Sequence, residues 1–251
     1  MPQYTFAQQR CVNHLLLDTP IRTSALRTLG AYADVFALES FIDEVAGAHG
    51  ADPVEFRLRH LQDPRARAVI ERTAALAQWR ATAVRDMQGP KTAVMPGLLN
   101  GRGIGFAKYK NLAAYCAVVV DLSVDTHSGA VRVERALATV DAGLVINPDG
   151  LRNQIEGGLI QSASWTLMEQ VDHDRSRTLA RSWADYPILR FPQVPAVTVD
   201  IVNRPQERSL GVGEGAQGPI AAAIANAFAQ ATGRRVRDLP FAAQTVLRAL
   251  A

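Results

Sequence analysis

Glu214 is the only ionisable side chain of a glycine-rich loop that spans residues 211–218. The four glycines of this loop allow its backbone to approach a ligand closely. An apolar helix is predicted directly after the loop, over residues 219–231, and Gly233 is placed to end that helix. A carboxylate beside an apolar helix start loses hydration, which would raise its pKa toward neutrality and suit it to act as a general base. From these residues alone, a hydrated surface glutamate is an equally open interpretation.

A second pair of candidates, Gln154 and Gln161, lies on a long helix predicted from Asn147 to Met168. The two glutamines are seven residues apart, nearly two turns, so both amides share one face and could contact one ligand. Between them, the pair Gly157–Gly158 costs about 1 kcal/mol per glycine relative to alanine. Close approach of another backbone or of a bulky cofactor would offset that cost. The alternative is tight helix packing with both amides in solvent.

Residues 22–30 form a basic segment just before another predicted helix, at 34–47. Two arginines and the backbone N–H groups near a helix start suit an anion such as a phosphate. A plain basic loop is at least as compatible with the same residues.

Composition excludes several classes of function. A chain of 251 residues with 48% hydrophobic and 20% charged residues is typical of a globular protein. The net charge is only +3, and the densest arginine cluster, residues 234–237, indicates a solvated face or a contact for one phosphate, not a nucleic-acid surface. Cys11 and Cys116 lack metal-ligand spacing and the five histidines are isolated, so we expect no metal held by side chains and a buried thiol at Cys116.

No apolar run reaches the length of a membrane-spanning helix, and the start of the chain lacks a signal-peptide pattern. We therefore expect no membrane insertion and a cytoplasmic protein. A periplasmic location stays open, because the chain could travel with an exported partner.

The remaining pattern predicts an α+β fold, with helices and strands interspersed but no regular βαβ repeat. Extended segments are expected over residues 4–17, and helices after Asp52 and Asp63, where a capping aspartate precedes a proline; the second is expected to reach about Trp79. A linker is expected over 80–100. Strands are expected over four segments: 103–109, 113–125, 130–141 and 197–202.

Glycines 101, 103 and 105 invite comparison with a dinucleotide-binding fingerprint. They precede a predicted strand and do not link a strand to a helix, so the phosphate-binding turn of that motif is not expected. No GxxxxGK[ST] loop is present either. A free-standing nucleotide- or anion-binding module is therefore the least favoured class.

Six strings follow one another along the chain: LRTLGAYADVFALESFIDEVA, DPVEFRLRHL, GRGIGFAKYKN, INPDGLRNQIEGGLIQS, YPILRF and LGVGEGAQGPIAAAIANAFAQATGRRVRDLPF. Taken in this order, they resemble the C-terminal portion of the molybdopterin-binding large subunit of the xanthine dehydrogenase and aldehyde oxidase family. The likeness covers nearly the whole chain and is greatest to the branch of the isoquinoline 1-oxidoreductase β subunit and the nicotinate dehydrogenase large subunit.

The resemblance implies a role for each candidate. Glu214 matches the family's catalytic base, which deprotonates a water or hydroxide on molybdenum so that its oxygen attacks an electron-poor carbon. Gln154 matches a glutamine near the metal centre, and Arg27 with Thr28 matches a segment whose backbone lines that centre. Gly211, Val212 and Gly213 belong to the loop that carries the base, and are expected at the cofactor. The metal is held by the pterin dithiolene, so no side-chain metal ligand is expected.

The resemblance also implies cofactors and partners. The cofactor is molybdopterin, as the cytosine dinucleotide, with Mo, and [2Fe–2S] clusters reside on a partner subunit. We expect residues 1–100 to form a helical and extended portion of the cofactor-binding region, and residues 101–251 an α+β subdomain that carries the Glu214 loop. The family's large subunit is longer than this chain, so a complementary molybdenum-binding half is expected to come from a split subunit or from the rest of a longer protein.

The implied reaction is hydroxylation of an N-heteroaromatic or aldehyde substrate with oxygen from water, in the presence of the partner half. The alternative is a non-catalytic truncated remnant or an assembly subunit of such a complex. No nucleic-acid partner is expected.

Overall fold

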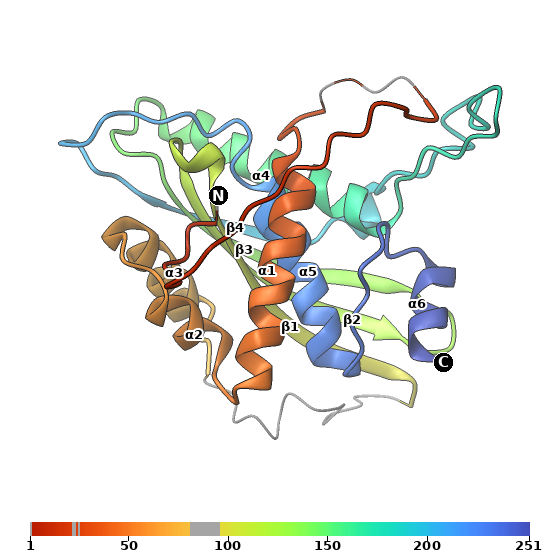
Figure 1. Ribbon diagram of the computed structural model, residues 1–251, viewed down its shortest axis with the longest axis horizontal. Coiled ribbons are helices and arrows are strands. Elements are labelled where there is room, and N and C mark those ends of the chain that lie inside the picture. The colour runs from red at the N-terminus through yellow and green to blue at the C-terminus, as the bar shows by residue number, and fades with distance from the viewer. Residues whose placement is uncertain (1, 22–23, 25, 81–95) are drawn as a thin grey trace.

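A computed structural model describes residues 2–21, 24, 26–80 and 96–251. Its centre is a mixed four-stranded sheet of order β1-β2-β3-β4 (Figure 1), which confirms the α+β class. The strands are β1 (Leu98–Lys108), β2 (Tyr115–Asp125), β3 (Val131–Asp141) and β4 (Ala196–Val202). The first three strands are antiparallel, whereas β4 runs parallel to β3 because a helical crossover separates them.

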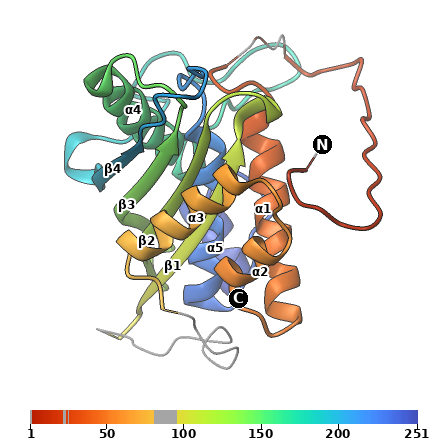
Figure 2. The same cartoon turned by 90° about the vertical axis from the view of Figure 1, so that its left-hand side faces the viewer.

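The helices lie on both faces of this sheet, with α2 and α3 on one face and α5 on the other (Figure 2). They are α1 (Ala31–Ala48), α2 (Pro53–Arg59), α3 (Pro64–Leu76), α4 (Pro148–Leu167), α5 (Gln217–Thr232) and α6 (Ala243–Leu250). Short 3₁₀ turns occur at Tyr109–Asn111 and Phe191–Gln193. No helix that the structure describes is both long and apolar enough to cross a membrane.

The protein has two apolar cores, one on each face of the sheet. Strand β2 contributes side chains to both, because its alternate side chains point to opposite faces. Val118 and Val120 belong to the core beneath α4 and α5, whereas Val119 belongs to the core beneath α1, α2 and α3. The predicted buried strand is confirmed. Cys116 is fully buried in the same strand, as predicted, and burial raises the pKa of its thiol to about 12.

The ends of the helices follow the predicted signals in most cases. Asp52 caps α2 by accepting a hydrogen bond from the Val54 N–H, and Asp63 caps α3 in the same way. Gly233 ends α5 in a left-handed conformation with φ of 69°. The predicted start of α1 is wrong by three residues and α3 ends at Leu76, earlier than expected, while α6 was not predicted.

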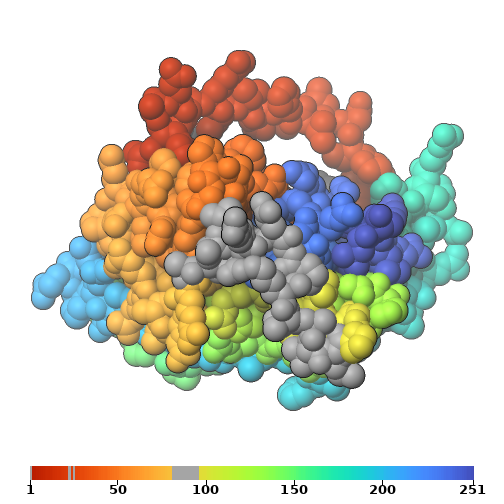
Figure 3. Space-filling view, turned by 90° about the horizontal axis from the view of Figure 1, so that it is seen from below, coloured from red at the N-terminus to blue at the C-terminus, as the bar shows by residue number. Residues whose placement is uncertain are grey.

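The predicted linker over 80–100 is only partly testable. Residues 81–95 lie outside the described residues, and β1 begins at Leu98, so the end of the expected linker is strand. Helices from the 1–100 portion share a core with β1 and β2, and the division at residue 100 stays a prediction. Residues 5–20 form neither helix nor strand, and part of this segment stands off the body in the space-filling view (Figure 3).

Glycines 101, 103 and 105 all lie inside β1, which begins five residues before the predicted strand start at Gly103, so the interpretation that they precede the strand is wrong. Helix α5 packs directly against the side of β1 to which the Cβ positions of these three glycines point. A Cβ at Gly103 would lie 2.2 Å from the Ala227 nitrogen and 2.3 Å from the Ala223 oxygen. The glycine spacing therefore permits backbone contact between β1 and the helix that follows the Glu214 loop.

We expect the substitution Gly103→Ala to lower the free energy of unfolding by about 3 kcal/mol, because its methyl group would displace the α5 backbone. Urea denaturation of the purified protein measures the change. Gly157→Ala is the matched control, since a Cβ added at this position of α4 would meet nothing within 4 Å, and it should be neutral or slightly stabilising. Equal stability of the two variants would contradict this packing.

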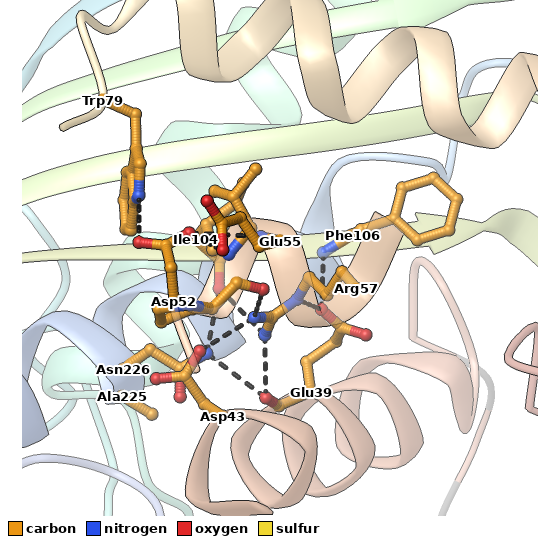
Figure 4. Close-up of polar contacts among 12 residues, drawn as sticks. Glu39, Asp43, Asp52, Glu55, Arg57, Trp79, Ile104, Phe106, Ala225 and Asn226 are labelled. Carbon is orange, nitrogen blue, oxygen red and sulfur yellow. Dashed lines mark hydrogen bonds and ion pairs between the residues drawn. The ribbon is translucent and has the colours of Figure 1, made fainter. Parts of the chain in front are cut away.

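A buried polar cluster joins α1, α2, β1 and α5 (Figure 4). The Arg57 side chain is fully buried, and its guanidinium contacts Glu39 Oε2 at 2.9 Å and Asp43 Oδ1 at 2.8 Å. Glu39 Oε2 also accepts a hydrogen bond of 3.0 Å from the Phe106 N–H. The cluster thereby fixes α1 against the end of β1.

The arginine cluster at residues 234–237 is solvated at two of its three arginines, because Arg234 and Arg237 are exposed. Arg235 departs from the predicted solvated face: it is largely buried and pairs with Asp43 and Glu44 of α1, and Arg237 also pairs with Glu44. Acidic side chains distant in sequence therefore neutralise Arg235 and Arg237.

Candidate functional site

Glu214 lies three residues before the first residue of α5, with its carboxylate fixed by two groups from distant parts of the chain. Its Oε1 accepts a hydrogen bond of 2.8 Å from the Thr28 N–H, and its Oε2 accepts one of 2.5 Å from the Tyr109 hydroxyl. The Thr28 hydroxyl also donates to the Glu214 carbonyl at 3.3 Å. The Glu214 loop is therefore anchored both to the segment before α1 and to the turn after β1.

The predicted rise in the pKa of Glu214 is wrong. Hydrogen bonds from Tyr109 and from the Thr28 backbone lower its pKa, and they outweigh the desolvation, which acts in the opposite direction. Lys110 and Arg27 lower it further. Burial and the contact with Glu214 raise the pKa of Tyr109 to about 12, so the phenol stays protonated and donates at neutral pH. At neutral pH Glu214 is therefore an ionised carboxylate that accepts hydrogen bonds from both groups.

Arg27 connects the Glu214 loop to helix α4. Its Nε donates to the Gly213 carbonyl at 2.5 Å, and its Nη2 donates to Gln154 Oε1 at 2.9 Å and to the Gln154 carbonyl at 3.1 Å. Its Nη1 donates to Gln161 Oε1 at 3.2 Å. The prediction that the two glutamines share a helix face is confirmed, and Arg27 is the group that their amides contact.

Strained backbone occurs on both sides of Glu214. Thr28 and Leu29 have φ of 80° and 53°, and Lys110 and Asn111 have φ of 50° and 59°. Left-handed conformations cost a non-glycine residue about 1–2 kcal/mol. Two such pairs flank a single carboxylate, which is typical of functional sites.

A cavity of about 1180 Å³ opens over Glu214. Segment 28–31, the end of β1 with the turn after it, the start of α5 and residues 10–13 line it. A second hollow of about 1260 Å³ lies beyond Arg27 and Leu29 and is lined by aromatic side chains, including Trp165, Trp183 and Tyr186. The segment that carries Arg27 and Thr28 therefore borders both spaces.

Not every predicted residue joins this arrangement. The Gly211 carbonyl accepts from the Ala114 N–H at 3.3 Å, and Val212 packs against the core, so both residues support the loop. Arg22 of the basic segment lies outside the described residues. The Thr28 N–H binds Glu214, not an external anion.

Tyr109 is the functional candidate that sequence reasoning missed. The local sequence around Tyr109 did not indicate a functional role, because its partner Glu214 is 105 residues away in the sequence.

The residues around the Glu214 loop fit a bulky group that carries hydrogen-bond donors and acceptors. A pterin is such a group. Nothing lies within 4 Å of the Cβ positions of Gly157 and Gly211, so both backbones are open to close approach. Gln217 is buried, and neither amide atom of its side chain has a hydrogen-bond partner in the part of the chain that the structure describes. Among those residues, no group of three or more His, Cys, Asp or Glu side chains could hold a metal ion directly.

Residues 42–195 match the family described as the molybdopterin cofactor-binding domain. The chain is 43% identical to a nicotinate dehydrogenase subunit of Pseudomonas putida, over 100% of this chain and 21% of that protein. It is 35% identical to the isoquinoline 1-oxidoreductase β subunit of Brevundimonas diminuta, over 86% of this chain and 26% of that protein. It therefore spans only a minor part of these relatives.

The fold has a counterpart among solved structures. Quinoline 2-oxidoreductase from Pseudomonas putida 86 superposes with a TM-score of 0.79 at 15% identity, over 90% of this chain and 53% of that chain. The aldehyde oxidoreductase of Desulfovibrio gigas superposes with a TM-score of 0.75 at 17% identity, over 90% of this chain and 41% of that chain. These structures show the shared fold, and the sequence matches, over more than half of the chain, show that the chain belongs to the molybdopterin cofactor-binding domain family of the xanthine dehydrogenase and aldehyde oxidase type.

Proposed function

We propose that this chain supplies the catalytic base, Glu214, to a molybdenum hydroxylase that acts on an N-heteroaromatic or aldehyde substrate. The molybdopterin cofactor, in the proposed cytosine dinucleotide form, would supply the oxidising centre at which oxygen from water enters the substrate. A complementary molybdenum-binding half and a [2Fe–2S] partner subunit would complete the enzyme. The two relatives named above, a nicotinate and an isoquinoline oxidoreductase, support the heteroaromatic class.

The observation that carries this proposal is the fixed, ionised carboxylate at the cavity. Thr28 and Tyr109 each donate one hydrogen bond to Glu214, so one lone pair on each oxygen stays available for a proton from the reacting water. The carboxylate is only partly exposed, and its orientation is set before substrate arrives. Glu214 would accept the proton, and Tyr109 would hold the carboxylate in place.

Arg27 would position the site without taking part in proton transfer. Its guanidinium ties the Gly213 carbonyl to Gln154 and Gln161, so the loop and helix α4 move as one unit. Gln154 Nε2 is not used by Arg27, which leaves a donor for the cofactor. The open backbone at Gly157 and Gly211 would admit the flat ring system beside it.

The test is to purify the chain together with its partner subunits and to supply a heteroaromatic substrate in ¹⁸O-labelled water. We expect bound molybdenum and a hydroxylated product that carries the label. Absence of molybdenum and of product from the complete assembly would exclude the proposal and favour a non-catalytic remnant.

The variant Tyr109→Phe should shift the acid limb of the kcat/KM profile to higher pH. The phenol stabilises the ionised form of Glu214, so its loss raises the Glu214 pKa toward the ordinary value, and the variant loses activity at a higher pH than the unmodified enzyme does. A pH series from acid to neutral measures the shift. Tyr186→Phe, whose hydroxyl binds Glu169 instead, is the control and should leave the limb in place. An unmoved limb in Tyr109→Phe would exclude control of Glu214 by this phenol.

A further inference from the structure

We propose that residues 12–17 dock on the complementary molybdenum-binding half as an added β-strand. This inference rests on the proposed function, because the complementary half belongs to the enzyme proposed there. It identifies a surface through which the two halves would meet.

The run 12–17 exposes four apolar side chains within six residues. Val12 is 56% exposed, and the side chains that follow are exposed further: 78% at Leu15, 77% at Leu16 and 85% at Leu17. The run contains no Asp, Glu, Lys or Arg. A continuous apolar run of this kind is typical of a surface that another protein segment covers.

The backbone of this run is also without partners. Among the residues that the structure describes, 10–17 make no hydrogen bond or ion pair, and they form neither helix nor strand. The red N-terminal segment that contains the run stands off the body in two views (Figures 2 and 3). An extended backbone with unpaired N–H and C=O groups can add as a strand to the edge of another sheet, while its side chains enter apolar pockets.

The run begins close to a fixed point of the fold. Tyr4 is 2% exposed and its hydroxyl donates to the Glu39 carboxylate of α1. The Thr5 N–H donates to the His60 carbonyl at 2.7 Å. The start of the segment is therefore held against α1 and the end of α2, which limits the positions that residues 12–17 reach and favours docking at one place.

The position of the run at the cavity indicates the complementary half as its occupant. Val12 and the three residues next to it, 10, 11 and 13, line the cavity over Glu214. A half that holds the cofactor at this cavity would lie against the same wall. This chain spans only 21% and 26% of the nicotinate and isoquinoline relatives, so most of the length of each lies outside the matched part. A lipid bilayer fits less well, because it would leave the unpaired backbone groups without partners.

Hydrogen exchange of the amides in residues 11–18, measured by mass spectrometry, tests the inference on the isolated chain and on the assembled enzyme. In the isolated chain these amides should exchange at the rate of an unstructured peptide. In the assembled enzyme they should exchange at least about a hundredfold more slowly, because hydrogen bonds to the neighbouring strand protect them. Equal rates in the two samples would overturn the inference. Protection that develops in the isolated chain as its concentration rises would assign the run to a second copy and would also overturn it.

The variant Leu16→Asp tests the contribution of the side chains. It should lower the protection of the run in the assembled enzyme by at least about tenfold, because a carboxylate would replace a leucine that docking buries. The isolated variant should unfold at the same urea concentration as the unmodified chain, since Leu16 is exposed there. Ile146→Asp is the matched control: Ile146 is 75% exposed, lies before α4 and should leave the protection unchanged. An equal loss in both variants would contradict docking through residues 12–17.

Hydroxylation of a heteroaromatic substrate and molybdenum content are measured on the same preparation. An active assembly in which residues 11–18 exchange as fast as in the isolated chain would overturn this inference while the proposed function stands. Absence of molybdenum and of product from the complete assembly would instead remove the proposed function and this inference with it.

Discussion

Replacing Glu214 with glutamine in the assembled enzyme is expected to lower kcat by about 10²–10⁴-fold, because the neutral amide cannot accept the proton from the reacting water. The side chains have nearly the same shape, and a glutamine oxygen can still accept from the Thr28 N–H. The loop should therefore keep its structure and the molybdenum content should be unchanged. Steady-state rates and metal analysis of the same preparation measure both quantities.

Asp34→Asn is the matched control for this substitution. Asp34 lines the same cavity, but no hydrogen bond to Thr28, Tyr109 or Arg27 involves it among the described residues. We expect its rate to remain within a few-fold of the unmodified enzyme. A similar loss of rate in both variants would show a general effect of charge and would contradict the base role of Glu214.

The largest expected effect on stability comes from Arg57→Met, which should lower the free energy of unfolding by about 3–5 kcal/mol. Arg57 is fully buried, and its removal leaves the buried carboxylate of Glu39 without a cation and Asp43 with only the longer contact to Arg235, at 3.8 Å (Figure 4). Denaturation by urea measures the change. The same variant should loosen the end of β1, since Glu39 also binds the Phe106 N–H.

Arg132→Met gives the comparison for a surface ion pair. Arg132 and its partner Glu134 are both more than 45% exposed, and such pairs contribute less than about 1 kcal/mol. A loss from Arg57→Met no larger than the loss from Arg132→Met would contradict the structural role of the buried cluster.

Local patterns in the sequence predicted most of the elements that position the site. The aspartate–proline caps of α2 and α3, the glycine that ends α5 and the apolar run of β2 all depend on neighbouring residues, so they were visible without the fold. Helix α4 was predicted for the same reason, and its period placed Gln154 and Gln161 on one face. The family resemblance directed attention to Arg27, Thr28 and the Glu214 loop.

Features that depend on distant contacts were predicted wrongly or missed. The pKa of Glu214 was expected to rise because only its own loop was considered, whereas the donors that lower it come from Thr28 and Tyr109. Pairing of Arg235 with Asp43 of α1 was invisible for the same reason. The glycines of β1 gave a signal, but its cause, the approach of α5, requires the tertiary structure.

The pKa of Glu214 is lowered by its hydrogen-bond donors, whereas desolvation would have raised it, so the two cases give bases of different strength. A lowered pKa makes Glu214 a weaker base, but it ensures that nearly every molecule holds the proton acceptor in its charged form at neutral pH. In the proposed reaction, Thr28 and Tyr109 would position the carboxylate for proton transfer, and the cofactor, when bound, would supply the acidity of the reacting water.

Rapid mixing of substrate with the oxidised holoenzyme, under anaerobic conditions and over a single turnover, separates proton transfer and substrate oxidation from later electron transfer. If Glu214 is the base, Glu214→Gln should slow reduction of the bound cofactor by about the same 10²–10⁴-fold factor as kcat. A reduction rate equal to that of the unmodified enzyme, at equal molybdenum content, would contradict the role of Glu214 in the chemical step.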